Sequence, residues 1–235
     1  MCANASTALD WRQVHFADST IVDLHAHPGL KISLFDRAFT AQFHADGAFN
    51  PFSFRANYDN LRAGGVAAVL SVVYAPERQI VTQEAPILKA MRVLRPRTWR
   101  KVFEGTYFDV ANKMLDDLEQ AVSVARSPVT GRPQAQVVRS VAELDTLLAR
   151  GTGRPIALIH CLEGAHSLSS GSHMTAPQLL ANLQHYHDRG VAYLTLAHFF
   201  ENDVVHPCFP WPETIQKLGF FRSERDITLG LKPAG

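Results

Sequence analysis

Most of the signals that would place this 235-residue sequence in a specialised class are missing. Its three cysteines show neither a CxxC motif nor paired spacing, which is typical of a reducing compartment. The net charge is only +1, and no basic stripe alternates with aromatic residues, which argues against nucleic acid as a partner. No apolar run approaches the roughly 20 residues of a membrane span, and the first ten residues lack the features of a signal peptide. We therefore expect a cytoplasmic protein with no membrane span.

Motifs of several catalytic classes are also missing. The chain has no G-x-S-x-G elbow, no P-loop and no G-x-G-x-x-G after a strand, which argues against nucleophilic hydrolases and nucleotide-binding enzymes. With 46% hydrophobic and 19% charged residues, the composition is that of an ordinary globular protein. No internal repeat or shift in composition marks a boundary, so we treat residues 1–235 as a single domain.

Apolar strands alternate with amphipathic helices along the chain. The clearest strand, residues 66–74, is apolar nearly throughout, which indicates a parallel sheet covered on both faces. The clearest helix, residues 111–125, places apolar side chains at i, i+3, i+4 and i+7. The other expected strands are 21–25, 135–139, 155–160 and 191–198, and the other expected helices are 58–64, 83–94 (stopped by Arg95-Pro96), 141–149 and 176–189. This alternation predicts βαβ units with a parallel sheet.

Residues 28–57 contain six phenylalanines but no sustained periodicity. A segment of this length in a compact domain is usually functional or contains short helices of its own. Two interpretations stay open: an insertion that acts as a lid, or an apolar cluster that covers one mouth of a barrel.

Two histidines lie at the end of the first expected strand, in Ile21-Val-Asp-Leu-His-Ala-His-Pro28. Residues two apart in a strand point to the same side, so His25 and His27 can present both imidazoles to one point. Neutral imidazole is a good ligand for zinc and similar ions. The alternatives are a surface pair or hydrogen-bonded core histidines, but the buried strand and the following Pro-Gly favour a metal site.

Polar side chains also follow three other apolar strands. Tyr74 follows the second strand, His160 and Glu163 follow a third, and His198 follows a fourth. In parallel α/β folds, functional residues gather at the carboxyl edge of the sheet, where these strand ends meet. Glu163 can bridge two metal ions through its two oxygens, as two-metal hydrolytic sites require, or it can be an ordinary carboxylate at a helix start.

The other polar candidates are assigned by their position. We expect Asn202 and Asp203, in the loop after His198, to face a substrate together with Tyr74. His160 is predicted to contact the substrate or to orient a metal ligand. A position as an ordinary polar loop residue is also open for His160, and His166 can likewise orient a ligand or lie in a polar loop, whereas loop or surface positions are expected for His173, His185 and His187.

In these motifs the sequence resembles the membrane (renal) dipeptidase family, the M19 peptidases of the amidohydrolase superfamily. The matching segments occur in the family's order and span most of the chain. They are Ile21-Val-Asp-Leu-His-Ala-His27, residues 57–74, Ile159-His-Cys-Leu-Glu-Gly-Ala-His166, Gly190-Val-Ala-Tyr-Leu-Thr-Leu-Ala-His198 and Ile227-Thr-Leu-Gly-Leu-Lys-Pro-Ala-Gly235.

The resemblance implies a (β/α)8 TIM barrel of the metal-dependent hydrolase type with a site for two zinc ions. His25 and His27 would hold one metal, and Glu163 would bridge both. His198 would contact the substrate or polarise its scissile carbonyl. The implied reaction is attack of an activated water on an amide bond.

Two departures from the family's pattern bear on these expectations. The dipeptidases have His-x-Asp at the first pair, whereas this chain has His25-x-His27, which is commoner among amidohydrolases. The sequence also stops at Gly235, although a complete barrel needs roughly 250 residues or more. We therefore expect an incomplete barrel, about the first half to two thirds, with the ligands of the second metal beyond it.

Three functional hypotheses follow. The leading one is a zinc-dependent, dipeptidase-like hydrolase that uses a metal-activated water to cleave a dipeptide or a small amide. The second is an amidohydrolase for a lactone, a cyclic amide or an N-acyl compound. The third is an inactive partial barrel with only a binding role. A homodimer is one assembly that we consider.

Overall fold

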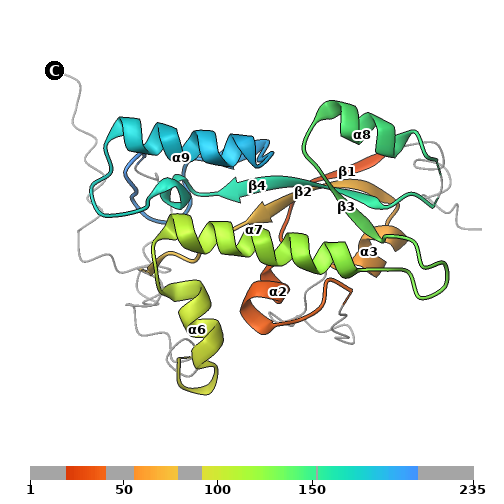
Figure 1. The fold of residues 1–235 in the computed structure, drawn as a ribbon, viewed down its shortest axis with the longest axis horizontal. Coiled ribbons are helices and arrows are strands. Elements are labelled where there is room, and N and C mark those ends of the chain that lie inside the picture. Colours follow the sequence, from red (N-terminus) through yellow and green to blue (C-terminus); the bar gives the residue numbers. More distant parts are fainter. Residues whose placement is uncertain (1–19, 41–55, 79–91, 152, 206–235) are drawn as a thin grey trace, which may run out of the picture.

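The computed structural model describes residues 20–40, 56–78, 92–151 and 153–205 of the chain. Within these residues five strands pair in parallel in one sheet (Figure 1). The strands are β1 (Ile21–Ala26), β2 (Val66–Val73), β3 (Ala135–Val138), β4 (Ile156–Glu163) and β5 (Tyr193–Thr195). Their order is β1-β2-β4-β3, with β5 beside the carboxyl end of β4. The predicted α/β fold with a parallel sheet is confirmed.

Helices lie on both sides of this sheet. They are α2 (Leu30–Phe35), α3 (Tyr58–Ala63), α6 (Pro96–Phe103), α7 (Tyr107–Val124), α8 (Val141–Leu148), α9 (Ala176–Asp188) and the short 3-10 helix η1 (Ala165–Leu168). Leu118 of α7 is in one buried cluster with Ile156 and Leu158 of β4. Leu147 of α8 is in another cluster with Ala157, the residue between them. Because side chains alternate along a strand, α7 and α8 cover opposite faces of β4, as Figure 1 shows.

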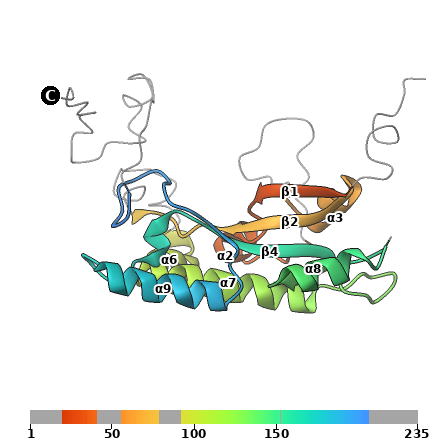
Figure 2. The ribbon, with the colours of Figure 1, turned by 90° about the horizontal axis from the view of Figure 1, so that it is seen from above.

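The register of the sheet brings the polar strand ends together. In the β2–β4 pair, Val73 lies opposite Leu162, and in the β4–β5 pair Glu163 lies opposite Thr195. Figure 2 shows β1, β2 and β4 side by side in that order. The residues that follow these parallel strands therefore meet at one edge of the sheet, as expected for a functional site in this class of fold.

One helix start and one whole helix differ from the sequence prediction, each for a local reason. Helix α7 begins at Tyr107, four residues before the predicted start, because Thr106 and Asp109 form a capping box. Helix α6 was not predicted, since Pro96 was interpreted as a stop. Proline lacks a backbone N–H and therefore suits the first turn of a helix, which is where Pro96 lies.

Other expectations are met in part. Only residues 193–195 of the expected strand 191–198 pair as a strand, although the carbonyl of Leu196 still accepts a bond from Ala165. Of the expected helix 83–94, only residues 92–94 are described, and they are helical. Within the segment 28–57, residues 30–35 form α2, and residues 41–55 lie outside the described part. The lid and the closure of the barrel stay predictions.

Candidate metal centre

His25 and His27 point to one place from the end of β1, as their spacing predicts. Their Nε2 atoms are 3.1 Å apart, and the rings meet edge to face with centroids 4.9 Å apart. Glu163, the last residue of β4, faces both rings. The distance from His25 Nε2 to Glu163 Oε1 and the distance from His27 Nε2 to Glu163 Oε2 are both 3.4 Å. Strands far apart in the sequence thus bring together two imidazoles and a carboxylate.

The spacing of these three side chains suits a tetrahedral metal ion. Zinc binds histidine nitrogen and carboxylate oxygen at about 2.0–2.2 Å, so tetrahedral ligands of one ion lie roughly 3.3–3.5 Å apart. The separations of 3.1, 3.4 and 3.4 Å are close to that value. Among the described residues, His25, His27 and Glu163 form the one group of three or more potential ligands that converges in this way.

The tautomer of His27 also suits metal binding. Its Nδ1 lies 3.2 Å from the carbonyl oxygen of Val72, which can only accept a hydrogen bond. The Nδ1 atom therefore carries the proton, and the lone pair is on Nε2, the atom that faces Glu163. Burial lowers the pKa of His27, against the opposing effect of the Glu163 charge, and this favours the neutral ring that binds metals.

A glycine follows Glu163 because no other residue fits. Gly164 has φ +89°, a conformation that favours glycine, and a Cβ there would lie 2.2 Å from Cε1 of His166. It would also lie 3.2 Å from Cβ of His198. The chain therefore passes close between two histidines immediately after the carboxylate, and this holds Glu163 at the edge of the sheet.

His198 also faces Glu163, at the same carboxylate oxygen as His25. Its Nε2 lies 3.6 Å from Glu163 Oε1, and its Nδ1 lies 2.8 Å from Glu77 Oε2. The ring of Tyr74 packs against it with centroids 4.4 Å apart. Burial raises the pKa of the Tyr74 hydroxyl, which therefore keeps its proton. The hydroxyl donates a hydrogen bond to Glu77 Oε2 at 3.0 Å. The structure therefore places His198 beside the candidate ligand Glu163 and Tyr74 beside His198, and their contact with a substrate stays a prediction.

Glu77 is the main residue that the sequence prediction missed. It is 2% exposed and lies four residues after the end of β2, where the prediction named only Tyr74. Burial favours a raised pKa, but hydrogen bonds from His198 and the Phe200 N–H, with nearby histidine charge, leave the pKa of Glu77 lowered. Glu77 is therefore a buried, ionised carboxylate.

The prediction for His160 is wrong. The side chain is fully buried, and its Nε2 lies 2.9 Å from Glu119 Oε1 of α7. His160 is on the same face of β4 as Ile156 and Leu158, which pack in the same buried cluster as α7, whereas Glu163 is on the opposite face. Alternation along the strand therefore turns His160 away from the metal centre, where it can neither contact a substrate nor orient a ligand.

Asn202 and Asp203 lie in the predicted loop, but their side chains bond within the protein. The Asn202 amide accepts hydrogen bonds from Val204 and Val205, and Asp203 Oδ2 accepts one of 2.8 Å from Ser169. His166 is buried, and its Nε2 donates to the carbonyl of Ala75 at 2.8 Å, so it is a structural polar residue. Exposed, as expected, are His173, His185 and His187.

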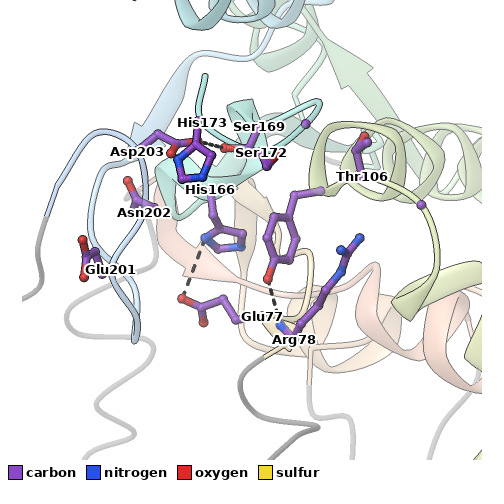
Figure 3. Close-up of a pocket in the computed structure, with 13 residues that line it drawn as sticks. Glu77, Arg78, Thr106, His166, Ser169, Ser172, His173, Glu201, Asn202 and Asp203 are labelled. Atoms are coloured by element: carbon purple, nitrogen blue, oxygen red, sulfur yellow. Dashed lines mark hydrogen bonds and ion pairs between the residues drawn. The ribbon is translucent and has the colours of Figure 1, made fainter. Parts of the chain in front are cut away.

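A cavity of about 520 Å³ adjoins the metal centre (Figure 3). Glu77 and His166 lie in its wall, pointing toward one another, and Asn202 and Asp203 line another side. The three candidate metal ligands do not line it. Its link to the candidate metal centre is a chain of side-chain contacts: Glu77, in its wall, bonds His198, which faces Glu163.

These observations define an α/β protein with a candidate metal centre at the carboxyl edge of a parallel sheet. The model of the membrane dipeptidase family, peptidase family M19, matches residues 12–219. The chain therefore belongs to this family, as its motifs predicted.

The comparison with solved structures finds a crystal structure of dipeptidase AC, a metallopeptidase of the same family. The sequences are 18% identical, and the match covers 74% of this chain and 41% of that chain, with a TM-score of 0.43. The chain thus spans about two fifths of the length of that relative. The comparison with curated proteins gives no match. No described helix is long and apolar enough to cross a membrane.

Proposed function

We propose that the chain carries the first half of the active site of a zinc-dependent hydrolase that cleaves dipeptides or similar small amides. His25, His27 and Glu163 hold the metal, and Glu163 has a second oxygen with which to reach a second ion. Family membership supports a metallopeptidase of the dipeptidase kind. The observation that carries the proposal is the spacing of 3.1, 3.4 and 3.4 Å between the three donor pairs, which suits a tetrahedral ion.

Zinc bound there supplies Lewis acidity and makes water a usable nucleophile near neutral pH. The side chains of the chain divide the remaining work. His27 keeps its Nε2 lone pair toward the ion because Nδ1 is held by Val72. His198 presents Nε2 toward Glu163 Oε1; once Nε2 carries a proton, the ring can donate a hydrogen bond to a substrate carbonyl oxygen as negative charge develops on it.

The cavity beside Glu77 supplies room for part of the substrate. About 520 Å³ lies within the usual range of pockets for small molecules, and its wall joins the network that ends at His198.

A second candidate is hydrolysis of a non-peptide lactone, cyclic amide or N-acyl compound. One observation favours it: His25-x-His27 is found where the dipeptidases have His-x-Asp, and the structure turns both imidazoles toward Glu163. A neutral second imidazole in place of an aspartate adds one unit of positive charge to the centre, which changes the substrates that it suits.

The test combines metal content with hydrolysis by the purified chain. We expect bound zinc, and hydrolysis of a panel of dipeptides that is lost on chelation and restored by zinc. Glu163→Gln and His25→Ala should lower both the bound zinc and the rate. The matched control is His187→Ala, which removes an exposed histidine of α9 and should change neither.

Two results would contradict the proposal. Undiminished zinc content in Glu163→Gln and His25→Ala would show that the metal is held elsewhere. Cleavage of lactones or N-acyl compounds, with no cleavage of any dipeptide, would favour the second candidate.

A further inference from the structure

We propose that Glu77 is the positioning residue of His198: its carboxylate fixes the ring with the proton on Nδ1 and aims Nε2 at the metal centre. The inference concerns the same site and rests on the proposed function only for its effect on catalysis. The tautomer itself follows from hydrogen bonds within the chain.

The contacts of Glu77 account for its position. Oε2 accepts a hydrogen bond from the Tyr74 hydroxyl at 3.0 Å and lies 2.8 Å from His198 Nδ1. Oε1 accepts a bond from the Phe200 N–H at 3.0 Å. A carboxylate that is 2% exposed is stable as an ion only when such donors satisfy it, so Glu77 is held by both the strand end and the loop after β5.

These contacts determine where His198 carries its proton. An ionised carboxylate has no proton to donate, so the hydrogen of the 2.8 Å bond belongs to Nδ1 of His198. In the neutral ring the lone pair is then on Nε2, which lies 3.6 Å from Glu163 Oε1. The Tyr74 ring, 4.4 Å away between centroids, limits rotation of the imidazole.

His166 does not share this role, although it lies near the same carboxylate. Its Nδ1 is 3.8 Å from Glu77 Oε1, which is too long for a hydrogen bond. Its Nε2 donates to the carbonyl of Ala75, and the Nδ1 of the neutral ring is then a lone pair. Of these two histidines, His198 alone donates to Glu77.

A histidine with a fixed tautomer has a defined task in catalysis. With Nδ1 held by Glu77, Nε2 of His198 is the single ring atom that can take up a proton, and it can donate a hydrogen bond to a substrate oxygen only after it has done so. The carboxylate also stabilises the imidazolium whenever Nε2 gains a proton. Carboxylates that orient histidines in metal sites typically contribute about 10- to 100-fold to activity or affinity.

The test reads the tautomer directly by ¹⁵N NMR of the histidine rings in the full 235-residue chain. At about pH 8.5, two units above the ordinary histidine pKa of about 6.5, neutral rings show which nitrogen carries the proton. His198→Gln identifies the resonances. We expect the Nδ1–H tautomer in the wild type and a larger Nε2–H fraction in Glu77→Gln, because the glutamine amide can donate to Nδ1.

Tyr74→Phe is the matched control. It removes the hydrogen bond that the Tyr74 hydroxyl donates to Glu77 Oε2 and the one that it accepts from the Glu77 N–H, but it leaves the His198–Glu77 bond, so the tautomer should not change. A purely structural role for Glu77 would leave the tautomer the same in Glu77→Gln. That result, or an Nε2–H tautomer in the wild type, would overturn the inference.

Kinetics with a cleaved dipeptide supply a second readout. Glu77→Gln should lower kcat by about 10- to 100-fold and leave KM nearly unchanged, since Nε2 of His198 acts on the reacting bond. An equal effect on kcat with a wild-type tautomer would overturn the positioning role. A wild-type chain that cleaves no substrate would contradict the proposed function alone, because the tautomer is measured without substrate.

Discussion

Zinc should stabilise this chain against heat, and loss of one ligand should abolish that effect. The three proposed ligands come from β1 and β4, which are far apart in the sequence and converge only when the sheet is folded. An ion that binds them therefore stabilises the native state over the unfolded chain. His27→Ala removes the ligand whose tautomer and direction the fold fixes most closely.

The size of the effect follows from binding linkage. At a zinc concentration 100-fold above Kd, the native state gains about 2.7 kcal/mol. For a chain of this length, each kcal/mol raises Tm by about 2–4 °C. The wild type should therefore melt about 5–11 °C higher with zinc than with a chelator, a difference that calorimetry or thermal fluorescence resolves easily.

Each protein is compared with itself, with and without zinc, so any intrinsic effect of a substitution cancels. His27→Ala should show almost no zinc-dependent shift in Tm, because only two of the three ligands remain and they bind zinc weakly. His187→Ala, which removes a histidine side chain that is 78% exposed, should keep the full shift. A full shift in His27→Ala, or no shift in the wild type, would refute the assignment of these ligands.

Three further substitutions test the surroundings of the site. Glu119→Gln should lower the free energy of unfolding in urea by about 1–3 kcal/mol, because buried His160 loses its charged partner. The His160 hydrogen bond lowers the pKa of Glu119 from its ordinary value of 4.5 to about 2. The difference in unfolding free energy between Glu119→Gln and the wild type should therefore be full above pH 4.5 and shrink as the pH falls toward 2. A difference that grows in acid would contradict this. Gly164→Ala should lower both stability and zinc affinity, measured by urea unfolding and by calorimetric titration, because the new Cβ meets the ring of His166. Leu118→Ala should cost about 2–5 kcal/mol of unfolding free energy, measured by urea unfolding, because Leu118 is fully buried in one cluster with Ile156 and Leu158.

The sequence alone predicted which side chains converge at the candidate metal centre, because their signals are local. His25 and His27 are two residues apart in a strand, and that spacing alone puts them on one side. Glu163 follows an apolar strand in the same way, and parallel pairing brings strand ends to one edge. The apolar run of residues 66–74 was likewise enough to predict a parallel sheet, because only a strand covered on both faces is apolar throughout.

Other features depend on contacts that are remote in the sequence. Glu77 follows β2 after a short irregular stretch, and its partner His198 is 121 positions further along the chain. No periodicity indicates such a pair. The prediction missed the start of α7 because a capping box, and not the apolar pattern, sets where that helix begins. It missed α6 because a proline was interpreted as a stop, whereas it lies in the first turn of that helix. The cytoplasmic location, the homodimer and the closed barrel stay predictions.

Two histidine–glutamate pairs in this chain have the same hydrogen bond but different consequences. His160 and Glu119 are joined at 2.9 Å, and His198 and Glu77 at 2.8 Å. The second nitrogen of His160 is buried, with no hydrogen-bond partner among the described residues, so that pair can only stabilise the packing of α7 on β4. The second nitrogen of His198 faces Glu163 instead. The direction of the remaining nitrogen, which the faces of the sheet and the loop after β5 decide, therefore distinguishes a structural pair from the pair that we propose to act in catalysis.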